Sequence, residues 1–378
     1  MSVAPLNAQF MNLFGVGYAG LSFFLSGLLW AHSLIQIPAG IILDKIGAYK
    51  GFLIAITLAF IANILPFLAP SHIILATCMR FLAGLSSGSL FLIGIKMIGM
   101  QAPPDKVAQA QGIQGASFCL GTMLPFITLP FIGHNAWYFS YIIPAILAVL
   151  SMGLSRLLPK TIRKTKTSNN SSALKLFSAL KIISTSSPIW ILGIFHGFSY
   201  GTLNNLGQWF PSILADIEGS SSAITWSLAT GMILLIGTLS RASGSILLKW
   251  FSKNTIINIS VCAIGILYVI LGLTGNIYIG LAVGFGLAIL GGCNYGSIFS
   301  MTGNIMSPLY LATAAGFMNM IANIANVLLT MILGTVREYT GSFSIALIAA
   351  GITALTIWLI GKYIIQNIKE NTSLNESV

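Results

Sequence analysis

Charged residues are scarce in this sequence. Asp, Glu, Lys and Arg make up only 7% of the 378 residues, while 56% are hydrophobic. Because soluble domains average about 25% charged residues, this composition excludes an ordinary soluble protein. Cysteines are also few: Cys78, Cys119, Cys262 and Cys293 lie within apolar stretches, at spacings that fit neither a disulfide framework nor a metal site. We therefore expect no metal and no cofactor.

Acidic residues are the rarest charged class. An integral membrane enzyme needs clustered nucleophiles, metal ligands or carboxylates at the membrane face, and the sequence has no such cluster. A channel would show a filter-like ring or a re-entrant loop, and neither is visible. We therefore expect a protein that is not an enzyme. The seven acidic residues, none of them in the middle of an apolar run, are Asp44, Asp105, Asp216, Glu218, Glu338, Glu370 and Glu376.

The sequence consists largely of long hydrophobic runs. Runs of about 20 residues can cross ~30 Å of hydrocarbon as α-helices, and they are too long for the strands of a membrane barrel. We therefore predict an all-α, polytopic membrane protein. The eleven runs are 21–43, 51–69, 73–99, 107–132, 137–158, 188–214, 223–250, 255–273, 277–301, 310–336 and 342–365.

The first twenty residues are uncharged and only mildly apolar. A signal peptide needs a basic segment at its start, and this stretch has none. It does not fit a complete spanning helix either. We predict that it is the tail of such a helix.

Most of the basic residues behind the formal net charge of +11 lie in or next to alternate connections between the runs. Lys45, Lys50 and Lys106 belong to connections on one side, and the connections on the other side carry almost no positive charge except Arg337, which has Glu338 beside it. Positive charge marks the cytoplasmic side of a membrane protein. We therefore expect the lipid bilayer rather than nucleic acid as partner, a multi-pass protein of the plasma (inner) membrane, and a cytoplasmic C-terminus.

One long polar stretch divides the runs into five and six. It is basic and rich in Ser, Thr and Asn. We predict an N-terminal helical bundle over 1–158, containing the remnant and five helices, and a basic cytoplasmic linker over 159–187. A six-helix bundle over 188–366 and a cytoplasmic tail over 367–378 complete the chain.

The two halves share an internal repeat. A shift of 204 residues places Gly40 on Gly244, Gly88 on Gly292, and the segment AQAQG at 108–112 on ATAAG at 312–316. Transporters are often built from two such halves, with the solute bound near the bilayer midplane. The symmetric parent would have twelve helices, so we expect this chain to lack most of the first, through a misplaced start or as a genuine variant.

Four segments resemble motifs of the major facilitator superfamily. Residues 40–50, GIILDKIGAYK, are similar to the loop between its helices 2 and 3, and 80–88, RFLAGLSSG, to its helix 4 pattern. Residues 112–125 and 334–342 resemble its Gly-rich helix 5 and the junction of its helices 11 and 12. The resemblance covers the chain apart from its start. It implies that fold, two pseudo-symmetric bundles with about eleven transmembrane helices, and a transporter.

The resemblance also implies a gate in the first of these segments. The family's loop acts as a cytoplasmic latch, which assigns gating roles to Gly40, Asp44, Lys45, Gly47 and Lys50. Glycines at the two framing positions would permit close packing and a tight turn. A plain positively charged loop is the alternative. In the second half Leu248 stands where the Asp would be, which places a second latch in doubt.

Two arginines stand out within the apolar runs, Arg80 and Arg241. Charges inside a span are costly and usually functional, and arginine suits carboxylate or phosphate, so an anionic solute would supply the missing charge. Bonds to backbone carbonyls are the alternative. The surroundings of Arg241 resemble helix 8 of the nitrate/nitrite porter branch, whose second arginine corresponds to Gln36 here. That difference weakens nitrate transport as a reading but leaves Gln36 a candidate binding residue.

Two polar stripes complete the candidate site. His196, Tyr200, Asn204 and Gln208 recur every four residues and share one helix face, with Asn205 beside them. Asn319, Asn323 and Asn326 repeat the pattern in a later run. Such groups should line a cavity rather than face lipid. Hydrogen bonds between helices alone are the alternative.

Together these features predict a secondary active or facilitative transporter, a symporter or antiporter, that moves a small polar or anionic solute by alternating access. A coupling proton or a counter-solute is a possible second partner, and we expect a monomer. The absence of an intramembrane acid leaves facilitated diffusion or anion exchange as open as proton coupling. Drug or multisolute efflux, a nitrate/nitrite-type porter and a non-transporting sensor or decayed transporter remain as alternatives.

Overall fold

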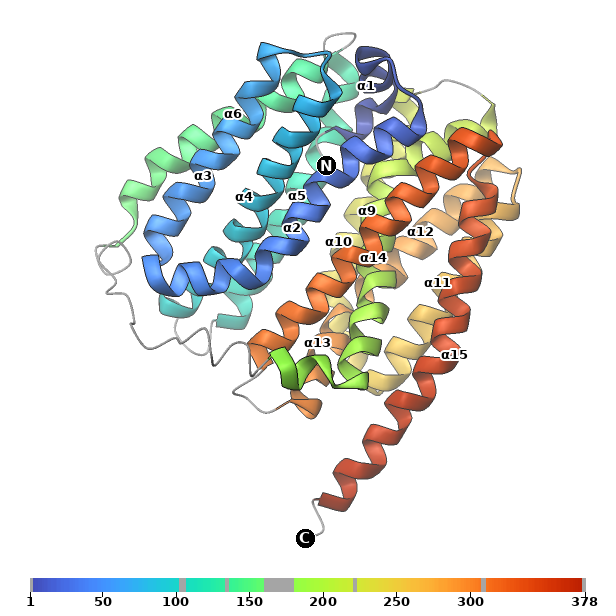
Figure 1. Cartoon of the computed structure of the whole chain (residues 1–378). Helices are drawn as coiled ribbons and strands as arrows, with labels where there is room; N and C mark the ends of the chain where they lie inside the picture. Colours follow the sequence, from blue (N-terminus) through green and yellow to red (C-terminus); the bar gives the residue numbers. More distant parts are fainter. Residues whose placement is uncertain are drawn as a thin grey trace. The chain divides into compact units, whose positions relative to one another are not determined.

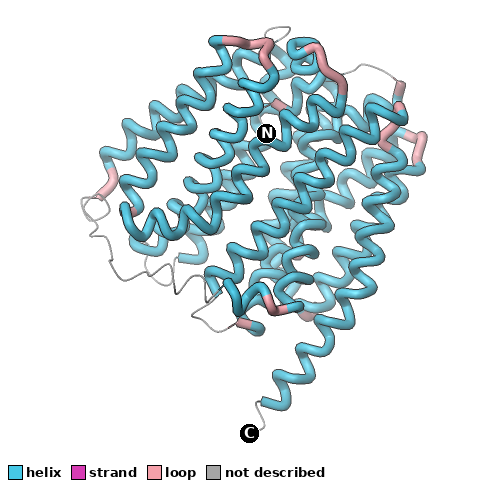
Figure 2. Tube along the Cα trace, in the orientation of Figure 1, coloured by secondary structure: helices cyan, strands magenta, loops and turns pink. Residues whose placement is uncertain are grey.

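The computed structural model describes residues 3–101, 107–132, 136–159, 180–219, 223–306 and 311–375. This part of the chain is helical and contains no strand (Figure 2). The chain divides into two compact units, Met1–Lys175 and Leu176–Val378, which we call unit 1 and unit 2 and describe separately. The division falls within the predicted linker, most of which lies outside the described residues.

Unit 1 is built around α4, which packs against α2 and α3, while α3 packs against α6 (Figure 1). The eight residues of α1 extend only about 12 Å, too short to cross a membrane. Short 3-10 turns stand at Ala4–Leu6, Leu65–Leu68, Leu129–Ile132 and Ser155–Leu157. The helices of unit 1 are α1 (Asn7–Phe14), α2 (Tyr18–Ile46), α3 (Ala48–Ile64), α4 (Ile73–Gln101), α5 (Val107–Thr128) and α6 (Ala136–Leu154).

Small residues let α4 approach the backbone of α2. A side chain at Gly84 would collide with the carbonyl of Leu28, and one at Gly88 would stand 3.0 Å from the carbonyl oxygen of His32. Small residues at four-residue spacing are typical of helices that pack closely in membranes. The helix 4 motif therefore has a direct packing role here.

A single residue, Gly47, separates α2 from α3. Its φ of 85° lies in the left-handed region that glycine adopts most readily, and its N–H donates to the carbonyl of Leu43 at 3.0 Å. The predicted tight turn is therefore present. Gly40, Asp44 and Lys45 lie on α2, but their side-chain environments fall outside the described residues.

Unit 2 contains three close helix pairs: α9 with α14, α10 with α12, and α11 with α15 (Figure 1). Gly193, Gly197 and Gly201 bring α9 against α14. A 3-10 turn, Gly244–Lys249, follows α10. The helices are α9 (Ser187–Glu218), α10 (Ala223–Ser243), α11 (Lys253–Leu273), α12 (Ile277–Cys293), α13 (Tyr295–Ile305), α14 (Leu311–Thr340) and α15 (Ser344–Asn375).

Each predicted hydrophobic run coincides with helix, so the all-α membrane fold is confirmed. In the described residues, nine helical stretches are long and apolar enough to cross a membrane, and Leu120–Ile132 is a shorter one. The run 277–301, predicted as one helix, is instead split at Asn294 into α12 and α13. The preceding pair Gly291–Gly292 explains the break, because glycine is a poor helix former.

The offset of 204 residues also relates helix ends. α4 begins at Ile73 and α12 at Ile277. Gly15 ends α1 with φ 64°, and Gly219 ends α9 with φ 72°. α1 is therefore equivalent to the last eight residues of α9.

Candidate functional site

An aromatic and cationic cluster joins α9, α10 and α13 in unit 2. The guanidinium carbon of Arg241 lies 3.7 Å from the centroid of the Tyr295 ring. The buried His196 ring lies 5.0 Å from Phe299 and 5.7 Å from both Tyr200 and Tyr295. A guanidinium stacked on an aromatic face keeps its edge donors available for a carboxylate or phosphate.

The sequence reasoning missed two members of this cluster, Tyr295 and Phe299. Both belong to α13, and Tyr295 is its first residue. The signal that could have found them is Gly-Gly-Cys-Asn at 291–294, because two glycines before an asparagine mark a break in an apolar run. Discontinuous helices are where transporters often build their sites.

Amide side chains connect α9 to α14 about halfway along both helices. Asn205 donates to the side-chain oxygen of Asn326 at 2.7 Å, and Thr330 donates to the side-chain oxygen of Asn205 at 3.0 Å. All three side chains are buried. This part of the polar stripes forms hydrogen bonds between helices, which was the alternative to a binding role.

Other atoms of the same stripes remain open. Asn204 and Asn323 each donate to a carbonyl of their own helix, those of Tyr200 and Asn319. The buried side-chain oxygens of Asn204 and Asn323 and the amide nitrogen of Asn326 have no hydrogen-bond partner among the described residues. The buried Gln208 completes the α9 stripe. The stripes therefore offer two acceptors and one donor.

Arg80 occupies a separate, donor-rich environment in unit 1. It is 8% exposed, and its guanidinium carbon lies 5.0 Å from the centroid of the Phe24 ring of α2. Tyr141 of α6 is close enough to interact electrostatically. Neither the Arg80 Nε nor the Tyr141 hydroxyl has a hydrogen-bond partner in the described part of the chain. The guanidinium can only donate hydrogen bonds, whereas the tyrosine hydroxyl can donate or accept, so the open Arg80 donor would suit an added acceptor.

The remaining predicted residues of unit 1 are dispersed. Gln36 is buried in α2, two residues before Pro38, and Lys50 is exposed at the start of α3. A residue that was not predicted, Lys96 of α4, donates from Nζ to the carbonyl of Leu43 at 3.3 Å. Lys96 therefore holds the end of α2 beside the predicted latch.

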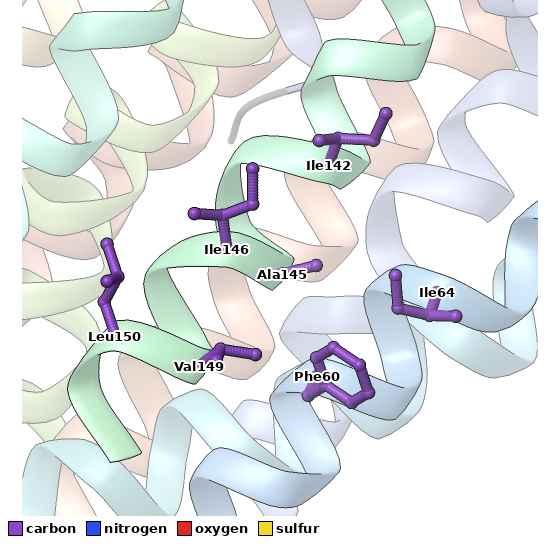
Figure 3. Close-up of a pocket in the computed structure, with 7 residues that line it drawn as sticks. All are labelled: Phe60, Ile64, Ile142, Ala145, Ile146, Val149 and Leu150. Atoms are coloured by element: carbon purple, nitrogen blue, oxygen red, sulfur yellow. The ribbon is translucent and has the colours of Figure 1, made fainter. Parts of the chain in front are cut away.

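A groove between α3 and α6 has a different character. Its volume is about 240 Å³, and every lining residue is apolar (Figure 3). Polar solutes need convergent hydrogen-bonding groups, so this groove is not a site for one. Its lining residues are Phe60, Ile64, Ile142, Ala145, Ile146, Val149 and Leu150.

Comparison with known proteins agrees with this architecture. The family model described as Major Facilitator Superfamily matches residues 1–330. A D-xylose-proton symporter structure is similar with a TM-score of 0.77, 15% identity and coverage of 94% of this chain and 92% of that one. A mutant of the nucleoside transporter NupG is similar with a TM-score of 0.73 and 16% identity. The match covers 97% of this chain and 95% of that one. The third structure is a bacterial homologue of the human lysosomal transporter Spinster in an inward-facing, occupied conformation. It is similar with a TM-score of 0.71 and 14% identity, and the match covers 98% of this chain and 93% of that one. A search of curated proteins found no match.

Proposed function

The chain belongs to the Major Facilitator Superfamily and is a secondary transporter, and on that premise we propose that its solute is a small hydroxylated organic anion, moved by alternating access. The solute's anionic group would meet Arg80 and Arg241, and its hydroxyl groups would meet the stripes of α9 and α14. Sugar acids and sugar phosphates have this combination of groups.

The observation that carries the proposal is the buried Arg80 guanidinium. Arginine stays protonated in proteins, and a buried charge needs a partner. Asp44, one of the two acidic residues of unit 1, follows Phe24 by twenty positions along α2, or about 30 Å. Asp105, the other, lies outside the described residues. An anionic solute would supply the acceptor that Arg80 and Tyr141 lack.

The open polar atoms of unit 2 support the proposal that the solute carries hydroxyl groups. The open oxygens of Asn204 and Asn323 accept hydrogen bonds, so they favour a solute that donates them. A hydroxyl group also accepts, which would satisfy the open amide nitrogen of Asn326. A simple oxyanion such as nitrate has no donor and would leave the two oxygens unpaired.

Arg80 lies seven residues after the start of α4, about 10 Å along the helix, and Arg241 is the third-last residue of α10. Each arginine would attract the anion within its own unit.

We also propose the gate, the surroundings and the assembly of the transporter. Gly40, Asp44, Lys45, Gly47 and Lys50 would form a cytoplasmic latch, which Lys96 would position through the end of α2. The alternation of positive charge favours a cytoplasmic C-terminus, and the plasma (inner) membrane is the default location for a chain with no visible targeting segment. No residue of the proposed sites requires a second copy of the chain, so a monomer suffices.

The test uses the purified chain reconstituted in liposomes. Thermal stabilisation and counterflow uptake would be measured with sugar acids, sugar phosphates, nitrate and neutral sugars. The wild type should respond to hydroxylated anions, and Arg80→Gln and Arg241→Gln should each weaken the response at least about tenfold, the equivalent of ~1.4 kcal/mol. Arg156→Gln, which removes an exposed arginine outside these sites, is the matched control. Equal responses to neutral sugars in all four proteins would contradict an anionic solute.

A further inference from the structure

The break between α12 and α13 disturbs the backbone inside an apolar span. In a continuous helix the N–H of Asn294 would donate to the carbonyl of Leu290, but here it turns to the carbonyl of Gly292. The Leu290 carbonyl also receives a weak contact from the thiol of Cys293 at 3.6 Å. The end of α12 therefore presents a carbonyl oxygen to which the N–H of Asn294 does not donate.

Two side-chain oxygens accompany this carbonyl. Asn294 is 0% exposed and Ser297 is 1% exposed. The amide nitrogen of Asn294 donates to the Ser199 hydroxyl of α9 at 2.6 Å, which fixes the orientation of the amide group. The Asn294 Oδ1 and the Ser297 Oγ have no hydrogen-bond partner among the described residues. Because the two residues are three apart, they share one face of the chain.

The repeat indicates that packing alone does not require these polar groups. The shift of 204 residues places Asn294 on Leu90 and Ser297 on Ile93 of α4. Ile93 is 1% exposed in a hydrophobic cluster with Leu43 and Ala55, and Leu90 packs against that cluster. The same positions are thus apolar in unit 1 and carry open oxygens in unit 2.

The surroundings bring further oxygens close to the break. A side chain at Gly292 would stand 2.5 Å from the carbonyl oxygen of Gly237, and one at Gly291 would stand 2.9 Å from that of Ser199. These glycines allow the backbones of α10 and α9 to approach α12. The C-terminal end of α12 and the N-terminal end of α13 meet at Asn294, so their opposite partial charges offset each other. The guanidinium of Arg241 lies over the adjacent Tyr295 ring. The polar groups at the break are neutral oxygens, the kind of ligand that a sodium ion takes.

We propose that the α12–α13 break binds a sodium ion, with Asn294 Oδ1, Ser297 Oγ and the Leu290 carbonyl among its oxygens. Broken helices with freed carbonyls hold sodium in other secondary transporters, and such sites need no carboxylate. This suits a chain whose seven acidic residues all lie outside the middle of the spans. A sodium site would allow ion coupling without a proton-carrying acid. The inference goes beyond the proposed anion and does not depend on it.

The test measures sodium binding without any solute. Thermal unfolding of the purified full chain in detergent would be followed in NaCl, KCl and choline chloride at equal ionic strength, together with equilibrium binding of radioactive sodium. Sodium alone should raise Tm of the wild type, saturably, by about 3–5 °C, with one ion bound per chain. Equal Tm in the three salts, or no bound sodium, would overturn the proposal and indicate a water-filled or empty break.

Variants identify the oxygens. Ser297→Ala should weaken the apparent sodium affinity about tenfold, and Asn294→Asp should raise it by adding a charge. Ser300→Ala is the matched control, because the Ser300 hydroxyl already donates to the carbonyl of Ser297 at 3.1 Å, and it should leave the sodium response unchanged. A sodium response retained in full by Ser297→Ala would exclude this site. If Ser297→Ala does not fold, the site is tested instead by the number of sodium ions bound per chain and by the sodium affinity of Asn294→Asp relative to the wild type.

Discussion

The helix α4 and the pair α12–α13 begin 204 residues apart at equivalent points of the repeat, yet only α4 is continuous. Both approach a neighbouring helix through a glycine at the same repeat position: Gly88 lies against α2, and Gly292 lies against α10. The comparison teaches that the close helix contact has been kept while the continuity of the helix has not.

The side chains of α4 and of α12–α13 differ in polarity at equivalent positions of the repeat, and each region is the more polar one at some of them. Arg80 of α4 corresponds to Gly284 of α12, where the ring of Phe210 occupies the space a side chain would need. Asn294 and Ser297 carry polar groups where α4 has apolar ones. Each unit therefore holds a buried polar feature that the other lacks. This asymmetry suits a transporter in which the two halves contact different parts of the cargo.

The largest expected effect concerns the shared glycine contacts. Gly88→Ala and Gly292→Ala should each lower the free energy of unfolding by about 3 kcal/mol, because the new methyl group would meet the backbone of the neighbouring helix, at the carbonyl oxygen of His32 or of Gly237. Unfolding in mixed micelles would measure the loss. Gly153→Ala on α6, where nothing lies within 4 Å, should stabilise by about 0.5 kcal/mol. Loss in only one of the two contacts would show that the repeat does not preserve packing.

The next effect concerns the amide connection between α9 and α14, which involves a part of α9 that α1 does not match. Asn205→Ala should cost about 2 kcal/mol, since it leaves the buried Asn326 and Thr330 without a shared partner. The same micelle titration applies. Asn63→Ala is the control, because the Asn63 side chain bonds to the carbonyl of Ala59 on its own helix. A loss no larger than in this control would make the connection energetically neutral.

The third effect has the opposite sign. Arg80→Met should raise the free energy of unfolding by about 1.5 kcal/mol, because it removes a buried charge whose partner is absent from the described residues, while it abolishes the anion response. Stability and uptake would be measured on the same preparation. Arg156→Met, at an exposed position, should change neither. A destabilised Arg80→Met protein would indicate that Arg80 serves the fold rather than the solute.

The sequence was sufficient for the fold because hydrophobic length and charge alternation are local properties. The eleven runs and the tight turn at Gly47 follow from residues close together in the chain, and the offset of the repeat follows from comparing the sequence with itself. The grouping of Arg241 with Tyr295, and the pairing of Asn205 with Thr330, could not be predicted in this way. Both depend on which helices pack together and on rotation about each helix axis, which a single sequence leaves undetermined.

The same limit explains the one exception to the predicted charge pattern, Arg337. Its Nε and Nη2 atoms lie 2.7 and 2.9 Å from the two carboxylate oxygens of Asp216, so the ion pair joins α14 to α9. The residue 204 positions before Asp216 is Asn12, which has no charge to form such a pair. The ion pair is therefore specific to unit 2. Its positive charge is neutralised locally, which removes the conflict with the alternation of charge.

The smallest expected effect is the contribution of this ion pair. A double-mutant cycle with Arg337→Gln and Asp216→Asn should give a coupling energy of about 0.5–1 kcal/mol, because both side chains keep 20–25% exposure and partly solvated pairs are weak. The two-point geometry favours the upper end of that range. Raising the salt concentration should reduce the coupling, since the Debye length falls to about 3 Å at 1 M. A coupling that salt leaves unchanged would mean that the pair is shielded from solvent.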